Sequence, residues 1–326
     1  MNKAHFLCLF VCLSLFGCGN KKEKNSLLTS AKINTISVII DDQLWDGEIG
    51  DSIRNKFASP VIGLPQEEPL FTINQFPVKL LEGYRTNSRN IIVIKKETKS
   101  RYEIKENEFS TPQNVIYISG KTTNEIIDTI QKKATAIVQK IRQTEIAENQ
   151  RLIDTSLLKT DRIKSKFKIK INVPKTYKYV LEKTKFIWLK KEITSGNNSI
   201  LIYQIPLNNI EKHPNSSVVS NIIKMRDSIG KLYIHGSVAN TRMITEEAYA
   251  PYFFNIKIDG KVTYETKGTW EMKNDFMSGP FINYCITDLK NNRMLVLEGF
   301  CYAPSKEKRD LMFEMESIIK SIKFVK

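Results

Sequence analysis

Hydrophobic residues in this chain follow two kinds of spacing, and the spacing changes along the sequence. Runs of β-branched or alternating hydrophobic residues, which are typical of strands, occur at 35–40, 91–94 and 114–119. A helical spacing occurs at 45–57 and again, over a longer stretch, after Thr122. The hydrophobic stripe of the longer stretch consists of Ile126, Ile130, Ala134, Ile137 and Ile141. We therefore expect a mixed first half that ends in a long helix.

The long helical pattern loses its stripe between Thr144 and Arg151, where every face is polar, and resumes at Leu152. A helix that is polar on all sides in its middle usually bridges two packed regions. The sequence therefore predicts two domains, one at 35–165 that includes the connecting helix and one at 166–326.

The second half is dominated by strand patterns. Strands are expected at 167–173, 177–180, 186–189, 200–205, 252–258, 262–266, 270–273, 281–287 and 294–302. Two helical stripes occur among and after them, at 215–232 and from Ser305 onwards. Asp259-Gly260 is a strong signal for a two-residue hairpin turn. The predicted fold class is α+β: two α/β domains with largely antiparallel sheets covered by helices and joined by a long helix.

The first 17 residues have the pattern of a cleaved signal peptide. Lys3 supplies a positive charge, and Ala4 to Phe16 form an apolar run shorter than the about 20 residues of a membrane-spanning helix. A leucine lies three positions before Cys18, and the small residue Gly17 directly precedes it. This resembles the bacterial lipoprotein signal, in which the cysteine thiol is acylated and becomes the first mature residue. The resemblance implies lipidation of Cys18.

A lipidated Cys18 would fix the protein to a membrane, because each buried methylene of an acyl chain contributes about 0.8 kcal/mol. The alternative is a plain secreted protein in which this cysteine is unmodified. The segment 18–34 is polar without a hydrophobic period, and we expect it to be a flexible tether. No second stretch of the sequence reads as a membrane span.

Charge and composition exclude few classes of function or partner. The chain carries a formal net charge of +15, but its basic residues are mostly scattered lysines with no run of five or more. A solvated surface accounts for this distribution better than a dedicated polyanion site does. Nucleic acid is not expected as a partner, because the signal directs the protein to the envelope.

Two cysteines remain after the signal and the lipidated residue, Cys285 and Cys301. They flank an expected hairpin with its turn at Asn291-Asn292, and this turn would pair position 285 with position 298. Cys301 would then lie on the opposite face of the sheet from Cys285. We expect two buried free thiols. A disulfide stays open, since a bulge or a longer turn could bring the two together in an oxidising compartment.

No catalytic or metal-binding motif is evident. His213 and His235 lack partners at metal-ligand spacing, and the acidic residues within 41–51 lack the calcium-loop pattern and suit a helix start. The sequence therefore predicts neither a metal nor a cofactor. An envelope hydrolase that acts on glycan or peptide remains the alternative function. It would use either a Cys–His pair with His235 or carboxylates such as Glu246-Glu247.

Aromatic residues give the better indication of binding. Four of them cluster around Pro251 and a tryptophan lies in the first domain. The candidate partner-binding residues are Trp45, Tyr249, Tyr252, Phe253 and Phe254. Such side chains stack on sugars or anchor protein partners, although aromatic residues are more often core. We predict a non-catalytic binding or assembly module that contacts an envelope protein, peptidoglycan or glycan through its second domain.

Several short segments together resemble a known family. They are the cysteine signal at Cys18, Trp45-Asp46-Gly47 with Gly50-Asp51, Leu64-Pro65-Gln66 with Glu68-Pro69 and Phe71, Arg89-Asn90-Ile91, and the closing Glu316-x-Ile318-Ile319-x-Ser321-Ile322. The chain is similar to an uncharacterised family of Bacteroidota lipoproteins, a domain of unknown function (DUF4837). The resemblance implies a Gram-negative envelope lipoprotein and no particular activity. Gly19, in place of Asp after the cysteine, implies the outer membrane. The second half also resembles the PsbP/Mog1-like sandwich, a fold used mostly for binding and assembly.

Overall fold

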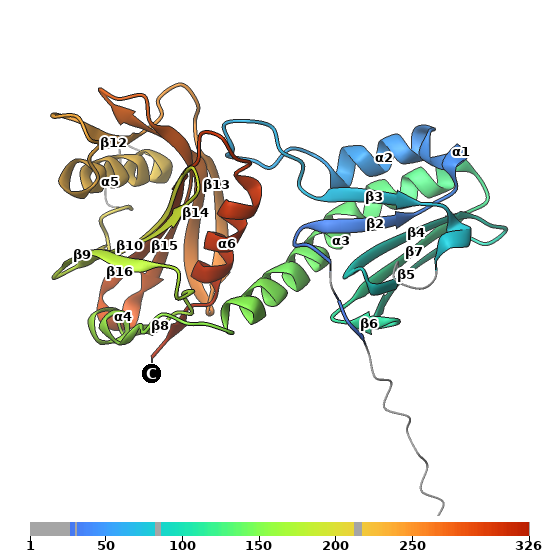
Figure 1. Cartoon of the computed structure of the whole chain (residues 1–326), viewed down its shortest axis with the longest axis horizontal. Coiled ribbons are helices and arrows are strands. Elements are labelled where there is room, and N and C mark those ends of the chain that lie inside the picture. The colour runs from blue at the N-terminus through green and yellow to red at the C-terminus, as the bar shows by residue number, and fades with distance from the viewer. Residues whose placement is uncertain (1–26, 30, 82–85, 212–216, 326) are drawn as a thin grey trace, which may run out of the picture.

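One long helix, α3 (Thr123–Ile153), joins two separate sheets in the computed structural model of the chain (Figure 1). Thr122 caps this helix, because its hydroxyl accepts a hydrogen bond of 3.2 Å from the Glu125 amide. The hydrophobic stripe predicted for this helix is buried against the first sheet. The α+β fold class with a long connecting helix is confirmed.

The structure describes residues 27–29, 31–81, 86–211 and 217–325. The signal peptide, Cys18 and His213 therefore lie outside the described residues. The described part of the predicted tether is attached to the first domain. Strand β1 (Leu27–Leu28) pairs with β6 (Ser110–Thr111), and Asn34 is buried.

The N-terminal sheet has five strands in the order β3-β2-β4-β7-β5. Its elements are β2 (Thr35–Ile39), α1 (Asp42–Trp45), α2 (Glu48–Phe57), β3 (Thr72–Phe76), η1 (Val78–Leu80), β4 (Asn90–Lys96), β5 (Arg101–Glu106) and β7 (Asn114–Gly120). Only β5 runs antiparallel to its neighbour, so this sheet is mainly parallel and differs from the largely antiparallel arrangement expected. The reason is that α2 lies between β2 and β3 and carries the chain back to the starting edge, as a parallel pair requires. Helices α2 and α3 cover one face.

The C-terminal sheet has eight strands and is antiparallel throughout, in the order β12-β14-β15-β16-β11-β10-β9, with β13 also paired to β14. Its strands are β9 (Lys178–Lys183), β10 (Phe186–Ile193), β11 (Gly196–Pro206), β12 (Arg242–Thr245), β13 (Tyr252–Ile258), β14 (Lys261–Lys273), β15 (Ser278–Asp288) and β16 (Arg293–Tyr302). The remaining elements are α4 (Asp161–Phe167), β8 (Ile169–Lys170), α5 (Val218–Tyr233), η3 (Leu289–Asn291), α6 (Arg309–Lys320) and β17 (Lys323–Phe324).

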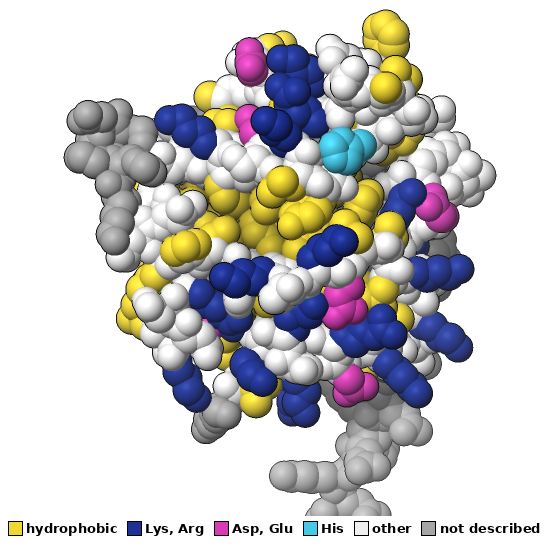
Figure 2. Space-filling view, turned by 90° about the vertical axis from the view of Figure 1, so that its left-hand side faces the viewer, with side chains coloured by type: hydrophobic (Ala, Val, Ile, Leu, Met, Phe, Trp, Pro, Cys, Tyr) yellow, Lys and Arg dark blue, Asp and Glu magenta, His cyan; other side chains and the backbone are white. Residues whose placement is uncertain are grey.

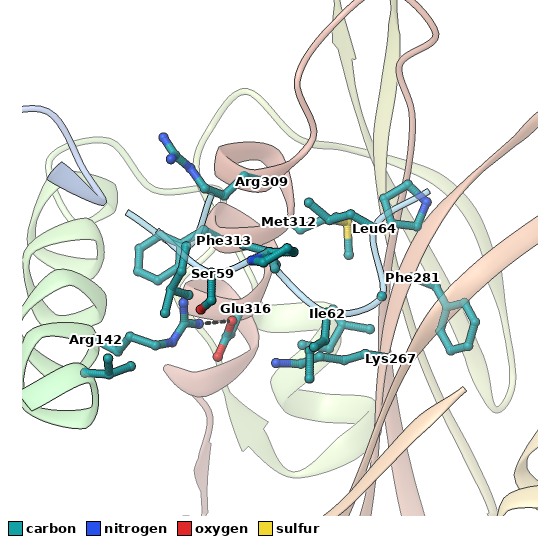
Figure 3. A pocket seen from close by; sticks show the side chains of 17 residues that line it. Ser59, Ile62, Leu64, Arg142, Lys267, Phe281, Arg309, Met312, Phe313 and Glu316 are labelled. Atoms are coloured by element: carbon teal, nitrogen blue, oxygen red, sulfur yellow. Dashed lines mark hydrogen bonds and ion pairs between the residues drawn. The ribbon is translucent and has the colours of Figure 1, made fainter. Parts of the chain in front are cut away.

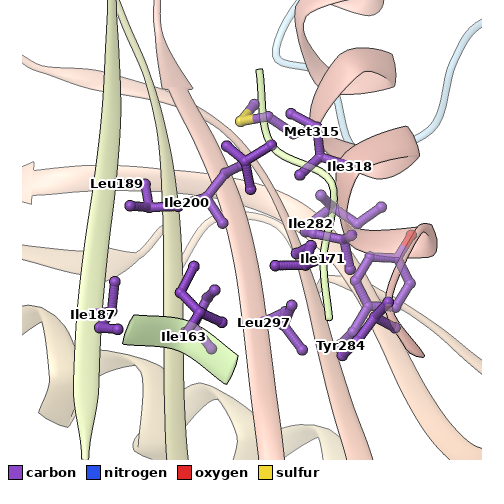
Figure 4. Packing of buried hydrophobic residues seen from close by; sticks show 14 of the residues in the cluster. Ile163, Ile171, Ile187, Leu189, Ile200, Ile282, Tyr284, Leu297, Met315 and Ile318 are labelled. Atoms are coloured by element: carbon purple, nitrogen blue, oxygen red, sulfur yellow. The ribbon is translucent and has the colours of Figure 1, made fainter. Parts of the chain in front are cut away.

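Helices cover both faces of this sheet and create two cores. Under α5, Arg226 donates two hydrogen bonds, of 2.9 and 2.7 Å, to Glu298, which also accepts one of 2.7 Å from Asn283, beside an apolar cluster. Under α4 and α6, aliphatic side chains such as Ile200 and Ile318 face one another (Figure 4). Ile153 at the end of α3 also belongs to this second core. The core of the second domain therefore begins ahead of residue 166.

Two hairpins test the turn predictions. Asp259 and Gly260 both have positive φ and connect β13 to β14, so the predicted two-residue hairpin is confirmed. Between β15 and β16 the register differs from the prediction, since Cys285 pairs with Val296 and not with position 298. The reason is that η3 lengthens the turn to four residues, between Asp288 and Arg293.

With the longer turn, the two cysteines still lie on opposite faces of the sheet, as expected. Cys285 lies in the core under α5 and Cys301 in the core under α6, and both are free and buried. The sheet itself separates the two thiols, so they cannot form a disulfide with each other in this fold. Among the described residues, no helix is long and apolar enough to cross a membrane.

Candidate functional site

A loop of the first domain, residues 59–70, reaches across to the second sheet, and we call it the junction loop. Its two ends are held together by hydrogen bonds from Val61 N–H to the Glu68 carbonyl (2.9 Å) and from Leu70 N–H to the Ser59 carbonyl (2.8 Å). At its tip Gly63 has φ +81, and a Cβ there would lie 3.0 Å from that of Lys267. Glycine is therefore needed for the loop to lie this close to β14.

Glu68 fixes the junction loop to the start of α6. Its two carboxylate oxygens accept hydrogen bonds from the backbone N–H groups of Lys308 (2.7 Å) and Arg309 (2.8 Å). A buried carboxylate here satisfies amides that the helix cannot pair and offsets the positive end of its dipole. Arg309 strengthens the attachment by donating to the Pro69 carbonyl (3.0 Å) and the Thr72 hydroxyl (3.1 Å).

Helix α3 contacts α6 through one ion pair and two amide contacts. Arg142 donates to Glu316 at 2.6 Å. Asn149 and Gln150 donate to the hydroxyl and the carbonyl of Ser317, at 3.1 and 2.9 Å. The two domains are therefore joined by specific polar contacts as well as by the chain itself.

Glu316 is buried, yet it stays ionised. Burial alone would raise the pKa of its carboxyl, but the positive charges of Arg142, Lys267 and Lys320 outweigh burial and hold the pKa well below the ordinary 4.5. Lys320 also donates a hydrogen bond of 2.6 Å to the same carboxylate. The pairing compensates the cost of a buried charge.

A cavity of about 310 Å³ lies under the junction loop, between α3, α6 and the sheet (Figure 3). Most of its lining is apolar and comes from all of these elements. The apolar lining includes Ile62, Leu64, Val138, Phe281, Met312 and Phe313. The charged side chains at its wall are Arg142, Lys267, Arg309 and Glu316. Apolar concave sites with a few polar groups are typical places for ligands.

The charges at this wall are already paired. Lys267 lies 3.3 Å from Glu265, which accepts a hydrogen bond of 2.8 Å from the Tyr284 hydroxyl. Burial, together with the charges of Glu316 and Glu265, raises the pKa of Tyr284 well above its usual value, so the phenol remains a donor. The cavity is therefore suited to hold an apolar group.

A second buried network holds the polar middle of α3 against the first sheet. Arg89 donates to both oxygens of Glu145, at 2.6 and 3.0 Å, and Asn90 donates at 2.6 Å. The backbone N–H of Asn34 donates to the same carboxylate at 2.8 Å, and the side-chain amide of Asn34 donates to Asp310 at 2.9 Å. The motif residues Glu68, Arg89, Asn90 and Glu316 thus all belong to contacts at or beside the junction, a grouping that sequence reasoning missed.

The structure brings some of the predicted binding residues together and separates others. Tyr252 and Phe254 lie on β13, directly across from the cavity residue Lys267 and its ion-pair partner Glu265. Phe253 points to the other face and packs on Tyr264, with ring centroids 5.6 Å apart.

Two of the predicted aromatic residues have different surroundings. Tyr249 is exposed in the loop before β13. Trp45 lies in the first domain under the guanidinium of Arg54, whose carbon is 4.5 Å from the ring centroid. Arg54 also donates to the Trp45 carbonyl at 3.2 Å, and the Trp45 side chain packs against the core of the first domain.

The surroundings of the cysteines and the histidine do not favour nucleophilic catalysis. Burial raises the pKa of Cys285, whose thiol donates to the Asn283 side chain, and raises the pKa of Cys301 to about 12. A thiolate is the reactive form, so neither thiol is poised to attack. The Nδ1 atom of His235 lies 2.8 Å from the carbonyl oxygen of Thr241, within hydrogen-bond distance. Within the described residues, no group of three or more His, Cys, Asp or Glu side chains could hold a metal ion.

The carboxylate form of the hydrolase alternative has equally little support. Glu246 accepts a hydrogen bond from the Thr269 hydroxyl, and its neighbour Glu247 is exposed. The two side chains therefore do not form a facing pair across a cleft.

The outer end of the second domain carries a basic surface. Figure 2 shows hydrophobic side chains gathered in a hollow on this end, with many Lys and Arg side chains and few acidic ones around it. The core under α5 includes partly buried hydrophobic residues such as Leu181, Trp188 and Tyr233.

Comparisons with known proteins give a family and no activity. A family model described as Domain of unknown function (DUF4837) matches residues 156–321, slightly more than half of the chain. A second, described as Domain of unknown function (DUF8532), matches residues 29–154. No curated protein matches the sequence.

Matches among solved structures are weak. A mutant of the protein Mog1 is 9% identical with a TM-score of 0.31, covering 48% of this chain and 91% of its own. The Saccharomyces cerevisiae Ran-binding protein Mog1p is 8% identical with a TM-score of 0.32, covering 48% and 90%. Human StAR-related lipid transfer protein 5 is 10% identical with a TM-score of 0.24, covering 55% and 95%. Scores this low carry no argument about function.

Proposed function

The chain belongs to the family described as Domain of unknown function (DUF4837), and from this premise we propose that it is a lipid-anchored, non-catalytic binding protein of the cell envelope. The observation that carries the proposal is the apolar cavity of about 310 Å³ under the junction loop. Sites of this kind bind apolar groups by excluding water from them.

The contacts around the cavity support a binding role. Both domains contribute to its wall, and the two are held together by Glu68, Arg142 and Glu316. A ligand in the cavity would touch both domains at once and would stabilise their present arrangement. The ligand we propose is an apolar chain or side chain presented by an envelope component, because each charged group at the wall already has a partner of opposite charge.

The location of the protein is proposed from the sequence. Lipidation of Cys18 would place it on a membrane of the envelope, and Gly19 favours the outer membrane. The envelope hydrolase gains no support from the buried settings of Cys285 and Cys301.

Binding to the cavity can be tested with the apolar fluorescent probe N-phenyl-1-naphthylamine and the variant Val138→Trp. Val138 lines the cavity, and a tryptophan there would fill it. We expect saturable probe binding by the natural protein and an affinity at least about tenfold weaker in the variant, which corresponds to about 1.4 kcal/mol.

The matched control is Leu289→Trp, which places the same side chain at a position that is 72% exposed and outside the cavity. Its probe affinity should equal that of the natural protein, and both variants should unfold at similar urea concentrations. Equal binding by all three proteins, or no saturable binding by any of them, would contradict the cavity as the ligand site.

A further inference from the structure

Strand β13 lies at an edge of the C-terminal sheet. It pairs with β14 along its whole length, from Tyr252 opposite Lys267 to Ile258 opposite Lys261. In the part of the chain that the structure describes, no strand pairs with its other side, and no backbone hydrogen bond leads from it elsewhere. Every second N–H and C=O of the strand therefore points outward, and these groups have no backbone partner among the described residues.

The side chains of β13 are unusually apolar for such an edge. Tyr252 and Phe254 lie on one face and are 50% and 38% exposed. Ile256 continues the same face and is half-buried. On the other face Phe253 is followed by the exposed residues Asn255 and Lys257. The strand thus offers an apolar stripe on one face and a single positive charge on the other.

The opposite edge of the same sheet is built differently. Strand β9 carries Lys178, Glu182 and Lys183, all of which are exposed. Charged residues of this kind discourage another strand from pairing with an edge. β13 has only Lys257 in this role, although it is one residue longer than β9. One edge of the sheet is therefore protected and the other is open.

We propose that β13 is a docking site for an extended peptide segment of a partner protein, which adds to the sheet as a further strand. A peptide is the occupant that this edge fits, because only another backbone presents N–H and C=O groups at the spacing of the strand. The peptide should place apolar side chains beside Phe254 and acidic ones beside Lys257, so apolar and acidic residues should alternate along it. No residue of β13 lines the junction cavity, so this surface extends the binding role to a second site.

The probe is a random 12-residue peptide library displayed on phage and selected against the full chain in detergent. We expect the selected peptides to alternate apolar and acidic residues. One selected peptide is then synthesised in two forms, with the backbone N–H groups of either the odd or the even residues methylated. Because an added strand uses only alternate N–H groups towards its neighbour, one form should lose at least about tenfold in affinity and the other should not.

The protein variant is Phe254→Lys, which adds a second positive charge and removes an apolar contact at an exposed position. It should weaken binding of the selected peptide by about tenfold or more. The control Val180→Lys also replaces an apolar residue with lysine, at a 49% exposed position on β9, and should leave the affinity unchanged. The cavity variant Val138→Trp should also bind the peptide normally, which separates this surface from the cavity.

Four outcomes would overturn the proposal. They are a selection that yields no binder, equal affinities of the two methylated forms, normal binding by Phe254→Lys, and occupation of the edge by a second copy. The last would appear in light scattering as a dimer of the free protein that Phe254→Lys dissociates.

Discussion

Glu68 is the residue whose position in the sequence says least about its role. It accepts two hydrogen bonds at the start of a helix that lies 240 residues further along the chain. Its neighbours Gln66 and Glu67 are exposed, while Glu68 is 7% exposed. Nothing in the local pattern distinguishes the three, because all are polar residues in a proline-bounded loop. Only the fold brings the amides of Lys308 and Arg309 to it.

Replacing this carboxylate should weaken the junction. We expect Glu68→Ala to lower the free energy of unfolding by about 1–2 kcal/mol, because two buried helix amides lose their acceptor. Urea unfolding followed by circular dichroism measures the change. Glu67→Ala, one residue away and exposed, serves as the control and should change stability by less than about 0.5 kcal/mol. Equal stability of the two variants would show that the cap contributes nothing.

At the scale of elements, α3 has two different surfaces along its length. Its first half buries the predicted stripe on the N-terminal sheet, whereas its polar middle buries Glu145 and Glu148. The hydrophobic period predicted the helix, and the loss of the period predicted a bridge between domains. The period could not show that the polar middle is buried. A buried glutamate and an exposed one are the same letter in the sequence, and Glu145 is buried because the fold places Arg89 beside it.

For the strands, too, the sequence predicted some features and missed others: it indicated position better than direction or register. Periodicity reports which face of a strand is buried, so it located β2, β4, β7 and most strands of the second sheet but not β3, β5 or β12. It carries no information on strand direction. The parallel pairing of β2 with β3 and β4 follows from the crossover through α2 and was not predicted. The turn at Asp259-Gly260 was correct because its residues tolerate positive φ. The turn before Arg293 was longer than Asn291-Asn292 alone indicated.

The contact between α3 and α6 should make stability depend on acid pH through Glu316. Its pKa in the folded protein is well below 4.5, so the ionised form stabilises the fold above that pH. This contribution is lost as the pH falls below 4.5 towards the lower pKa of the folded state. The natural protein should therefore lose unfolding free energy through this range.

The variant Glu316→Gln tests this dependence. At pH 7 we expect it to be less stable by about 2 kcal/mol, because the partly buried Arg142 loses the charged partner of its hydrogen bond. The difference from the natural protein should shrink as the pH is lowered from 5 to 3 in urea unfolding experiments. Glu307→Gln, at an exposed position just before α6, should instead follow the natural protein at every pH. A constant difference for Glu316→Gln across this range would refute the assigned role.

At the scale of the whole molecule, two domains share a junction and lie side by side (Figure 1). The described end of the predicted tether is attached to the first domain through β1 and Asn34. The proposed peptide edge on β13 and the cavity both belong to the second domain or to its contact with the first. The Asn34 side chain also donates to Asp310, the neighbour of the cavity residue Arg309, so the attached end of the tether lies beside the junction.

The proposed anchoring has a direct test. Cys18→Ala removes the thiol that would carry the diacylglyceryl group, and the protein should move from the membrane fraction to the soluble fraction of the envelope. Immunoblots of the two fractions measure the distribution. A conservative Cys8→Ala variant, which changes a cysteine within the predicted signal peptide, should leave the distribution unchanged. Membrane association of Cys18→Ala equal to that of the natural protein would rule out the lipid anchor.

The sequence by itself determined the α+β class, the long connecting helix and the hairpin at Asp259-Gly260, because each depends on residues close together in the chain. It also supplied the expectation of a lipid anchor, which is a local signal. Only the tertiary structure decided the parallel first sheet, the junction cavity, and the roles of Glu68, Arg89 and Glu316. These features depend on contacts between charged and apolar groups that are far apart in sequence, and local sequence patterns do not predict such contacts.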